Sequence, residues 1–253
     1  MATRRTPPPL TQISDNLLEV KNLTVDFISA SKAPVRAVEE VSFVIPRERT
    51  VALVGESGSG KSVSALAIMG LLPPQNSKVA LHSKIEYDNR SMLNLSRTDW
   101  QLIRGSRIAM IFQDPLMTLN PVLRIDTQMV EAVQAHHRVS KKAALARAAD
   151  ALTRVGIPSA LERLSAYPHQ FSGGMRQRVA IAIALLNEPD LIIADEPTTA
   201  LDVTIQSQIL SEVQGLTRES GTALIWITHD LAVVAGLADV IAVMYAGRIV
   251  ETG

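Results

Sequence analysis

Two hydrophobic patterns divide the chain into parts. Near the amino end, apolar and polar residues alternate over 17–27 and again over 41–45, which is the period of half-buried β-strands, and a polar loop is expected between them around 31–34. Further on, short apolar runs are typical of strands buried on both faces, as in a parallel sheet. These runs lie at 50–54, 107–112, 191–194 and 223–228. The pattern therefore predicts an α/β protein in which an antiparallel edge precedes a mainly parallel sheet.

A helical segment interrupts the apolar runs. A proline-bounded break at 114–121 is followed by helical periodicity over about 127–164, and Gly156 with Pro158 closes the predicted helix. The apolar face of this helix consists of Leu145, Ala148, Leu152 and Val155. Basic residues alternate with Asp150 and alanines, which favours a solvated face over a nucleic-acid patch. We expect a helical insert over about 114–188.

A glycine-rich octet follows the first apolar run and precedes a helix-like segment at 63–72. Its residues read G-x-x-x-x-G-K-S and are Gly55, Glu56, Ser57, Gly58, Ser59, Gly60, Lys61 and Ser62. Glycines let successive backbone N–H groups turn toward one anion, and the amino end of a helix adds positive potential. Lys61 would then reach the outer phosphates and Ser62 would ligate Mg²⁺. The alternative is a ligand-free glycine turn, but the strand and helix on either side favour a nucleotide triphosphate site.

Composition and charge narrow the class of protein. Lys+Arg and Asp+Glu both number 25, so the net charge is zero, which argues against a chain-wide attraction to nucleic acid. The chain has no cysteine, and its five histidines show no metal-ligand spacing. No apolar run reaches the roughly 18 to 20 residues of a membrane span. We expect a soluble cytoplasmic protein of which residues 1–16 are a floppy leader, and any membrane role requires a partner.

Polar residues follow the other apolar runs. Gln113 ends the second run, Asp195 and Glu196 end the third, and His229 follows the fourth. Each has a plainer interpretation, as a loop residue, an acidic turn or a structural histidine. However, open parallel sheets bind ligands at the carboxyl ends of their strands, so one triphosphate site can collect all four. Gln113 would then reach the metal or water, Asp195 would hold Mg²⁺ through water, Glu196 would polarise the attacking water, and His229 would contact the γ-phosphate.

Two further features carry weaker signals. Phe27, at the end of its strand, either stacks on an adenine ring or closes the edge of the core, and the sequence leaves both open. Ser172 is a natural N-cap for a helix running to about residue 186, and Gly173 and Gly174 would expose backbone N–H groups to an anion.

Together these residues resemble the ATPase subunit of an ATP-binding cassette (ABC) transporter, over about 17–253. In that family's order they correspond to the Walker A loop, Q-loop, signature, Walker B, D-loop and switch histidine, namely residues 55–62, Gln113, Ser172-Gly173-Gly174, Asp195-Glu196, Asp202 and His229. The stretches 112–115, 168–178 and 195–202 are similar to importers of oligopeptides, dipeptides and nickel. Met175 stands where the wider family usually has Gln, although the peptide group commonly carries Met.

The resemblance implies a P-loop NTPase fold with a RecA-like core, and ATP and Mg²⁺ as ligands. It implies that two cassettes, identical or different, close head to tail, with each ATP between the phosphate loop of one and residues 172–175 of the other. Glu196 would activate water, His229 would position the γ-phosphate, and Gln113 would sense Mg²⁺. The implied partners are transmembrane permease subunits, docked through 114–121 and the helical insert at the cytoplasmic face of the membrane, and indirectly a substrate-binding protein.

A second class is a soluble cassette ATPase that remodels ribosomes or DNA. DNA-repair cassettes carry a long coiled coil between the Walker A loop and the signature, and no sustained heptads lie between Ser62 and Ser172. Ribosome-acting forms join two cassettes by a charged linker, for which there is no sign here. A regulator without turnover is disfavoured because Glu196 and His229 are both present. Peptide-importer subunits usually continue beyond the hairpin expected at 244–250 into a C-terminal extension.

Overall fold

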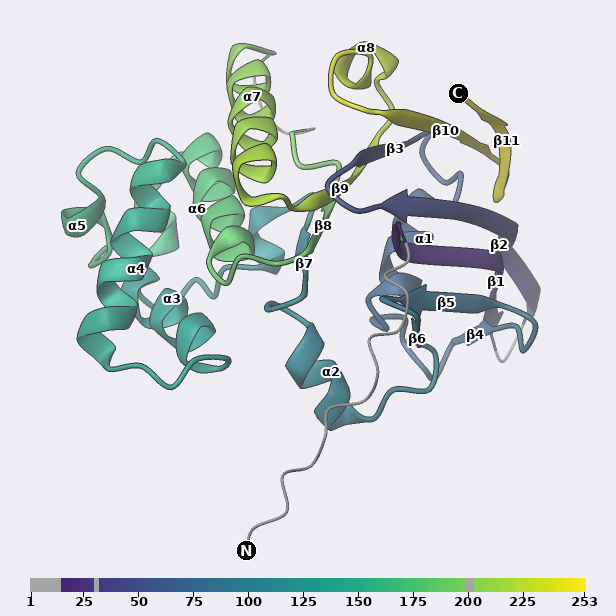
Figure 1. The fold of residues 1–253 in the computed structure, drawn as a ribbon, viewed down its shortest axis with the longest axis horizontal. Helices are drawn as coiled ribbons and strands as arrows, with labels where there is room; N and C mark the ends of the chain where they lie inside the picture. The colour runs from purple at the N-terminus through teal and green to yellow at the C-terminus, as the bar shows by residue number, and fades with distance from the viewer. Residues whose placement is uncertain (1–14, 30–31, 199–202) are drawn as a thin grey trace, which may run out of the picture.

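A 6-stranded sheet forms the centre of the computed structural model, which describes residues 15–29, 32–198 and 203–253. Its order is β11-β10-β3-β9-β8-β7, with β10, β3, β9, β8 and β7 parallel and β11 antiparallel to β10 (Figure 1). The strands are β3 (Thr50–Val54), β7 (Ile108–Ile111), β8 (Leu191–Asp195), β9 (Ala223–Thr228), β10 (Val240–Tyr245) and β11 (Arg248–Thr252). The four apolar runs are thus strands β3, β7, β8 and β9, and their predicted parallel pairing is confirmed.

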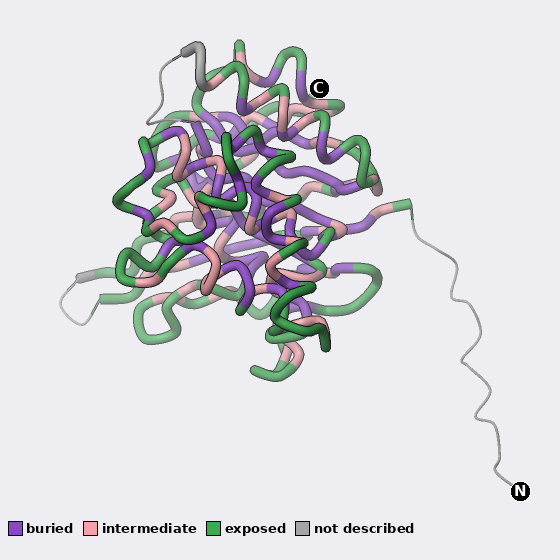
Figure 2. The backbone as a smooth tube through the Cα atoms, turned by 90° about the vertical axis from the view of Figure 1, so that its left-hand side faces the viewer, coloured by how far each residue is buried: buried purple, intermediate pink, exposed green. Residues whose placement is uncertain are grey.

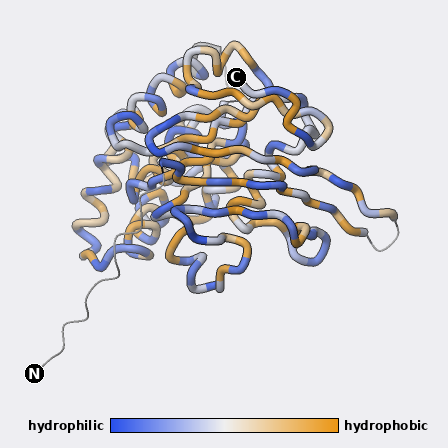
Figure 3. The backbone as a smooth tube through the Cα atoms, turned by 45° about the vertical axis from the view of Figure 1, so that its right-hand side comes forward, coloured by the Kyte–Doolittle hydropathy of each residue, from blue (hydrophilic) through white to orange (hydrophobic). Residues whose placement is uncertain are grey.

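The amino-terminal residues form a second, antiparallel sheet. Strand β1 (Asn16–Ser29) pairs with β2 (Lys32–Pro46), β4 (Ser77–Val79) and β5 (Lys84–Tyr87), and β6 (Arg90–Ser91) pairs with β5. Hydropathy alternates along the β1–β2 hairpin (Figure 3). The sequence predicts a polar loop around 31–34, which is wrong for the described positions 32–34. They belong to β2, because the two strands stay paired as far as Ser29 and Lys32.

Helices cover both faces of the parallel sheet. Helix α1 (Lys61–Ile68) lies on the side of the antiparallel sheet, and the helices of the predicted insert gather on the far side of the molecule (Figure 1). The latter are α3 (Ile125–Gln134), α4 (Lys141–Arg154), α5 (Ala160–Arg163) and α6 (Gly173–Leu185). The remaining helical segments are α2 (Arg97–Ile103), η1 (Pro115–Met117), η2 (Pro168–Gln170), α7 (Val203–Ser220) and α8 (Leu231–Val234). Helix α1 ends earlier than predicted because Gly70, at φ +60°, turns the chain out of the helix.

The hydrophobic core has two halves separated by the parallel sheet. Because strand side chains alternate, Val51 and Leu53 pack with α1 and the antiparallel sheet, whereas Ala52 and Val54 pack with the helical half. Figure 2 shows buried backbone through the middle of the molecule and exposed segments around it. A sheet buried on both faces requires apolar residues at every position, which is why β8 and β9 read as continuous apolar runs.

The predicted leader at 1–16 falls largely outside the described residues, which begin at Asp15. Asn16, which the prediction assigns to the leader, is the first residue of β1. Leu17, the predicted start of the nucleotide-binding domain, is buried at 2% exposure in the core between the two sheets.

Candidate functional site

The phosphate loop joins β3 to α1 and is pressed against two other strands. A Cβ added to Gly55 would lie 2.1 Å from the Met244 carbonyl oxygen of β10. Gly60 adopts φ +100°, and a Cβ there would lie 2.7 Å from the Ala37 carbonyl oxygen of β2. Side chains are excluded at both positions by backbone atoms, so glycine is required for the loop to close as it does.

Lys61 is held inside this loop. Its side chain is almost fully buried, and Nζ donates to the carbonyl oxygens of Gly55 (2.7 Å) and Glu56 (2.8 Å). Burial lowers the Lys61 pKa, and the nearby carboxylates of Glu196 and Asp195 oppose this shift. The ammonium group therefore lies at the loop together with the first backbone N–H groups of α1, an arrangement suited to binding phosphate oxygens.

Ser62 and Asp195 bring two hard oxygens together from different elements. Ser62 Oγ, in the first turn of α1, donates to Asp195 Oδ1 at the end of β8 over 2.9 Å. Burial raises the Asp195 pKa, while the Ser62 hydrogen bond lowers it. A hydroxyl and a carboxylate at this spacing fit Mg²⁺, which prefers oxygen ligands and retains several waters. Among the residues that the structure describes, no cluster of three His, Asp or Glu offers a competing metal site.

Glu196 connects the remaining strand ends. Its Oε2 lies 3.5 Å from Gln113 Nε2, which follows β7, and 3.3 Å from His229 Nδ1, which follows β9. Glu196 adopts φ +45°, a left-handed conformation that is rare outside glycine, while its N–H still donates to the Ile227 carbonyl (3.0 Å). Such backbone outliers concentrate at functional sites. The carboxylate is therefore held at the centre of the gathered strand ends.

These residues surround one cavity of about 480 Å³. Its lining consists of Ala37, Ser57, Gly58, Gly60, Lys61, Ser62, Val63, Gln113, Glu196 and His229. Ala37 and Val63 have apolar side chains, so the sequence does not mark them as site residues. Ala37 lies at the cavity because of how β2 is paired. Phe27 does not line this cavity. It is half-buried on β1, opposite Val35 and Ser77, so its proposed stacking on adenine stays a prediction.

The predicted signature lies elsewhere. Ser172 caps α6, its Oγ accepting a hydrogen bond from the Met175 N–H at 3.3 Å, so the predicted N-cap is confirmed. Ser172 and Gly173 are exposed, and Gly174 begins the buried face of the helix. Gly173 borders a second cavity of about 180 Å³ that also touches Gln113. None of residues 172–175 lines the first cavity, and Asp202 is outside the described residues.

The fold and the site together define a P-loop ATPase. The glycine loop, the buried lysine, the Ser62–Asp195 pair and Glu196 meet at the carboxyl ends of parallel strands, which is the arrangement that phosphoryl transfer to water requires. Among the described residues, no helix has both the length and the apolar character to cross a membrane.

Comparisons with known proteins identify the family. The ABC transporter family model matches residues 38–199. The chain is 52% identical to the dipeptide transport ATP-binding protein DppD of Bacillus subtilis (94% of this chain, 71% of the relative), and 48% identical to the oligopeptide transport ATP-binding protein OppD of Escherichia coli (98% and 72%). A dimeric post-hydrolysis structure of the ATP-binding cassette MJ0796, bound to ADP and Pi, has a TM-score of 0.82 at 28% identity (93% of this chain, 97% of that chain). The chain belongs to the ABC transporter family.

Proposed function

We propose that this chain is the ATP-hydrolysing subunit of a peptide importer and that it acts as one of two cassettes beneath transmembrane permease subunits, at the cytoplasmic face of the membrane. The observation that carries the proposal is the convergence of Lys61, Ser62, Gln113, Glu196 and His229 on one cavity. Relatives named for dipeptide and oligopeptide transport support peptides as the cargo class. A substrate-binding protein and the permeases would select the peptide itself.

In the proposed reaction, the phosphate loop and Lys61 bind the triphosphate. Ser62 and Gln113 would ligate Mg²⁺ directly and Asp195 would hold it through water; the ion would neutralise charge on the phosphate oxygens. Glu196 accepts a proton from water as the water oxygen attacks the γ-phosphorus. The bond from that phosphorus to the bridging oxygen breaks, giving ADP and Pi. His229 Nδ1 lies 3.3 Å from Glu196 Oε2, and on ATP binding the imidazole would turn its N–H to the γ-phosphate and position it.

The site is incomplete within one chain. Residues 172–175 carry an exposed helix start with free space at Gly173, yet they do not line the cavity that holds Lys61. A second cassette would complete each site by presenting its own Ser172 and Gly173 to the γ-phosphate. The neighbouring structure MJ0796 is itself a dimer.

For the permease, we propose a cleft between α2 and the end of α3. It encloses about 520 Å³ and is lined by Trp100, Gln101, Arg104, Ala135 and His136. Arg104 stacks over the Trp100 ring at 4.3 Å, which gives the cleft an apolar wall with a cationic face. Three exposed apolar residues lie between Gln113 and α3, namely Leu116, Met117 and Val122. A cleft with an apolar wall and a cationic face suits a short amphipathic helix.

Affinity purification of the full chain from detergent-solubilised membranes tests this proposal. We expect two permease subunits and a second cassette to be recovered. Ala135→Glu should weaken recovery by placing a negative charge in the proposed cleft, whereas Val250→Glu, which places the same charge at an exposed valine of β11, should not. Recovery with ribosomes or DNA, or of the chain alone from membranes that hold the permeases, would contradict the importer proposal.

The shared site has its own test. ATPase rate per chain should rise with protein concentration, because a complete site forms only when two cassettes meet. A dilute monomer that hydrolyses ATP at the full specific rate would contradict the shared site while leaving ATP binding intact.

A further inference from the structure

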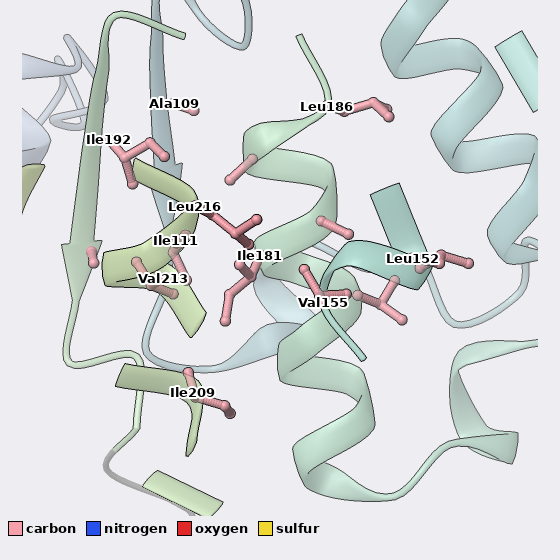
Figure 4. Close-up of a cluster of buried hydrophobic side chains, with 14 of the residues drawn as sticks. Ala109, Ile111, Leu152, Val155, Ile181, Leu186, Ile192, Ile209, Val213 and Leu216 are labelled. Atoms are coloured by element: carbon pink, nitrogen blue, oxygen red, sulfur yellow. The ribbon is translucent and has the colours of Figure 1, made fainter. Parts of the chain in front are cut away.

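Helix α6, which carries the signature at its amino end, is enclosed by two other helices. Figure 4 shows Ile181 of α6 between Val155 at the end of α4 and the α7 residues Ile209, Val213 and Leu216. All of these side chains are buried in the helical half of the core. Apolar contacts of this kind are strong but non-directional, so they hold the three helices together without determining the rotation of α6 about its axis.

Arg178 provides directional contacts at this junction. Its side chain, on α6, is only 13% exposed. Nη1 donates to the Val155 carbonyl at 2.7 Å and to the Glu212 carboxylate of α7, and Nη2 donates to Gln208 Oε1 at 3.4 Å. One planar guanidinium thus connects α6 to both neighbouring helices, with donors spaced in a rigid fork.

The end of α4 is shaped to receive this guanidinium. Gly156 adopts φ +70°, and the hydrogen bonds from Gly156 N–H to Thr153 O (2.9 Å) and from Ile157 N–H to Leu152 O (3.0 Å) close the helix. A Cβ on Gly156 would lie 2.9 Å from Arg178 Nη1. The negative end of the α4 dipole, together with Glu212, therefore surrounds a cation that almost fills the available space.

Other ion pairs between these elements lack such geometry. Arg154 of α4 approaches Glu219 of α7 at 3.8 Å, with side chains 40% and 73% exposed. Exposed pairs of this kind contribute little to a single fixed arrangement. The Arg178 contacts are shorter, more buried and divided between two helices, so they are suited to setting the orientation of α6.

We propose that Arg178 is a positioning residue for the shared ATP site. It fixes the axial position and rotation of α6 against α4 and α7, and so fixes where Ser172 and Gly173, roughly 9 Å along the helix, meet the second cassette. Helix α7 directly follows the predicted D-loop in sequence. The contact between Arg178 and Glu212 therefore couples the two segments that the partner would touch. This inference rests on the proposed shared-site ATPase.

ATP-dependent dimerisation of the full chain in a Glu196→Gln background tests it, because this readout is independent of the chemical step. Arg178→Ala should weaken the dimer and, with Glu196 restored, reduce kcat about 10- to 100-fold, as expected for small displacements in a reacting site. ATP affinity of the monomer should stay within about twofold, since no atom of Arg178 reaches the phosphate loop cavity. Arg154→Ala, the matched control, should change neither quantity.

Two further variants keep the inference falsifiable if Arg178→Ala folds poorly. Arg178→Lys keeps the positive charge and the aliphatic part of the side chain but not the forked guanidinium, so it should give an intermediate loss of dimerisation and kcat. Glu212→Gln should give a loss of similar size. The two substitutions should be non-additive when they are combined in one chain. Folded Arg178 variants with unchanged dimerisation and kcat would overturn the inference. So would equal losses in Arg154→Ala, or additive losses in the double variant. Failure of the wild type to dimerise with ATP would instead overturn the shared site.

Discussion

Helices α1 and α6 both begin next to glycines, but the rest of the chain packs tightly against the start of α1 and leaves the start of α6 open. In the first, backbone oxygens from β10 and β2 stand against Gly55 and Gly60, and Lys61 is buried among loop carbonyls. In the second, a Cβ on Gly173 would meet nothing within 4 Å, and Ser172 is exposed. The monomer's packing explains Gly55 and Gly60 of the first start but not Gly173.

A glycine can be required either by its own chain or by a partner, and the space around it distinguishes the two cases. A glycine pressed between backbone atoms, or held at positive φ as Gly58 is, is required for folding. A glycine such as Gly173, which faces open space without a positive φ, is not required by its own chain. Changes at the first helix start should therefore affect ATP binding and stability together. Changes at the second should affect only steps in which two chains meet.

The largest effect is expected at Glu196, which lines the same cavity as the start of α1 but follows β8. Glu196→Gln keeps the shape of the side chain and removes the base, so kcat should fall by a factor of about 10² to 10⁴ while ATP binding is retained. Steady-state hydrolysis and equilibrium binding of a fluorescent ATP analogue measure the two quantities. Turnover at the wild-type rate would remove Glu196 from the mechanism.

Ser172→Arg tests the second region with the next largest effect. A bulky cation at the exposed start of α6 should block closure of two cassettes, abolishing dimerisation and hydrolysis while ATP affinity of the monomer is unchanged. Both substitutions remove the cap to the Met175 N–H. Ser172→Ala measures that loss separately and should lower the free energy of unfolding by about 1 kcal/mol.

If instead Ser172 contacted ATP within its own chain, Ser172→Arg would weaken binding by about 1 to 3 kcal/mol, or five- to 150-fold. Titration of the analogue under monomeric conditions separates these outcomes, and a matching loss of affinity and turnover would contradict the shared site.

The contrast also explains how much was predictable. The strands that hold the site are buried on both faces, so β3, β7, β8 and β9 appear in the sequence as apolar runs, and the residues after them are those that meet. The distances between residues at different strand ends cannot be predicted from the sequence, because they depend on which distant strands pair and in what register. Thus Ala37 reaches the cavity without any chemical signal, and β2 begins at Lys32, well before the strand that the pattern predicts at 41–45.

The helical half shows the same limit. Periodicity indicates an apolar face on α4, and its members Ala148, Leu152 and Val155 are buried. The role of Arg178 could not be read from the same sequence, because its partners Val155 and Glu212 come from separate helices. Local periodicity in the sequence identifies which face of a helix is buried, but not which polar groups of other helices form hydrogen bonds with that helix.

A matched pair of glycine variants, one at each helix start, should have smaller effects than Ser172→Arg. Gly55→Ala drives a methyl group into the Met244 carbonyl and should destabilise the protein by about 1 to 3 kcal/mol and weaken ATP binding. Gly173→Ala fits its own chain, so its unfolding free energy should change by less than about 1 kcal/mol, while turnover falls. Urea unfolding measures the free energy of unfolding of each variant, and steady-state ATPase assays measure its turnover. Equal destabilisation by both variants would contradict the distinction between the two helix starts.

The smallest effect is expected at the amino ends of β7 and β8, where a polar cluster connects the two sheets. The hydroxyl of Tyr87, on β5, donates to Asp190 Oδ2 just before β8, and Arg107 Nε lies 2.9 Å from the same oxygen. Tyr87→Phe removes one hydrogen bond and leaves the ion pair, so the free energy of unfolding should fall by about 1 kcal/mol. ATP binding should not change, because this cluster lies at the amino ends of the parallel strands, whereas the phosphate loop lies at their carboxyl ends.

The pH dependence of this difference has a definite sign. Burial, followed by the Asp190 hydrogen bond, raises the pKa of Tyr87 above its ordinary value near 10. The folded state therefore retains the phenol proton at a pH where the unfolded state has lost it, so the stabilisation by Tyr87 is complete below about pH 10 and declines as the pH rises further. Urea unfolding of wild type and Tyr87→Phe at pH 8 and above pH 10 should show the difference shrinking. A difference that grows with pH would mean that the ionised phenolate, rather than the phenol, is the form the folded protein stabilises.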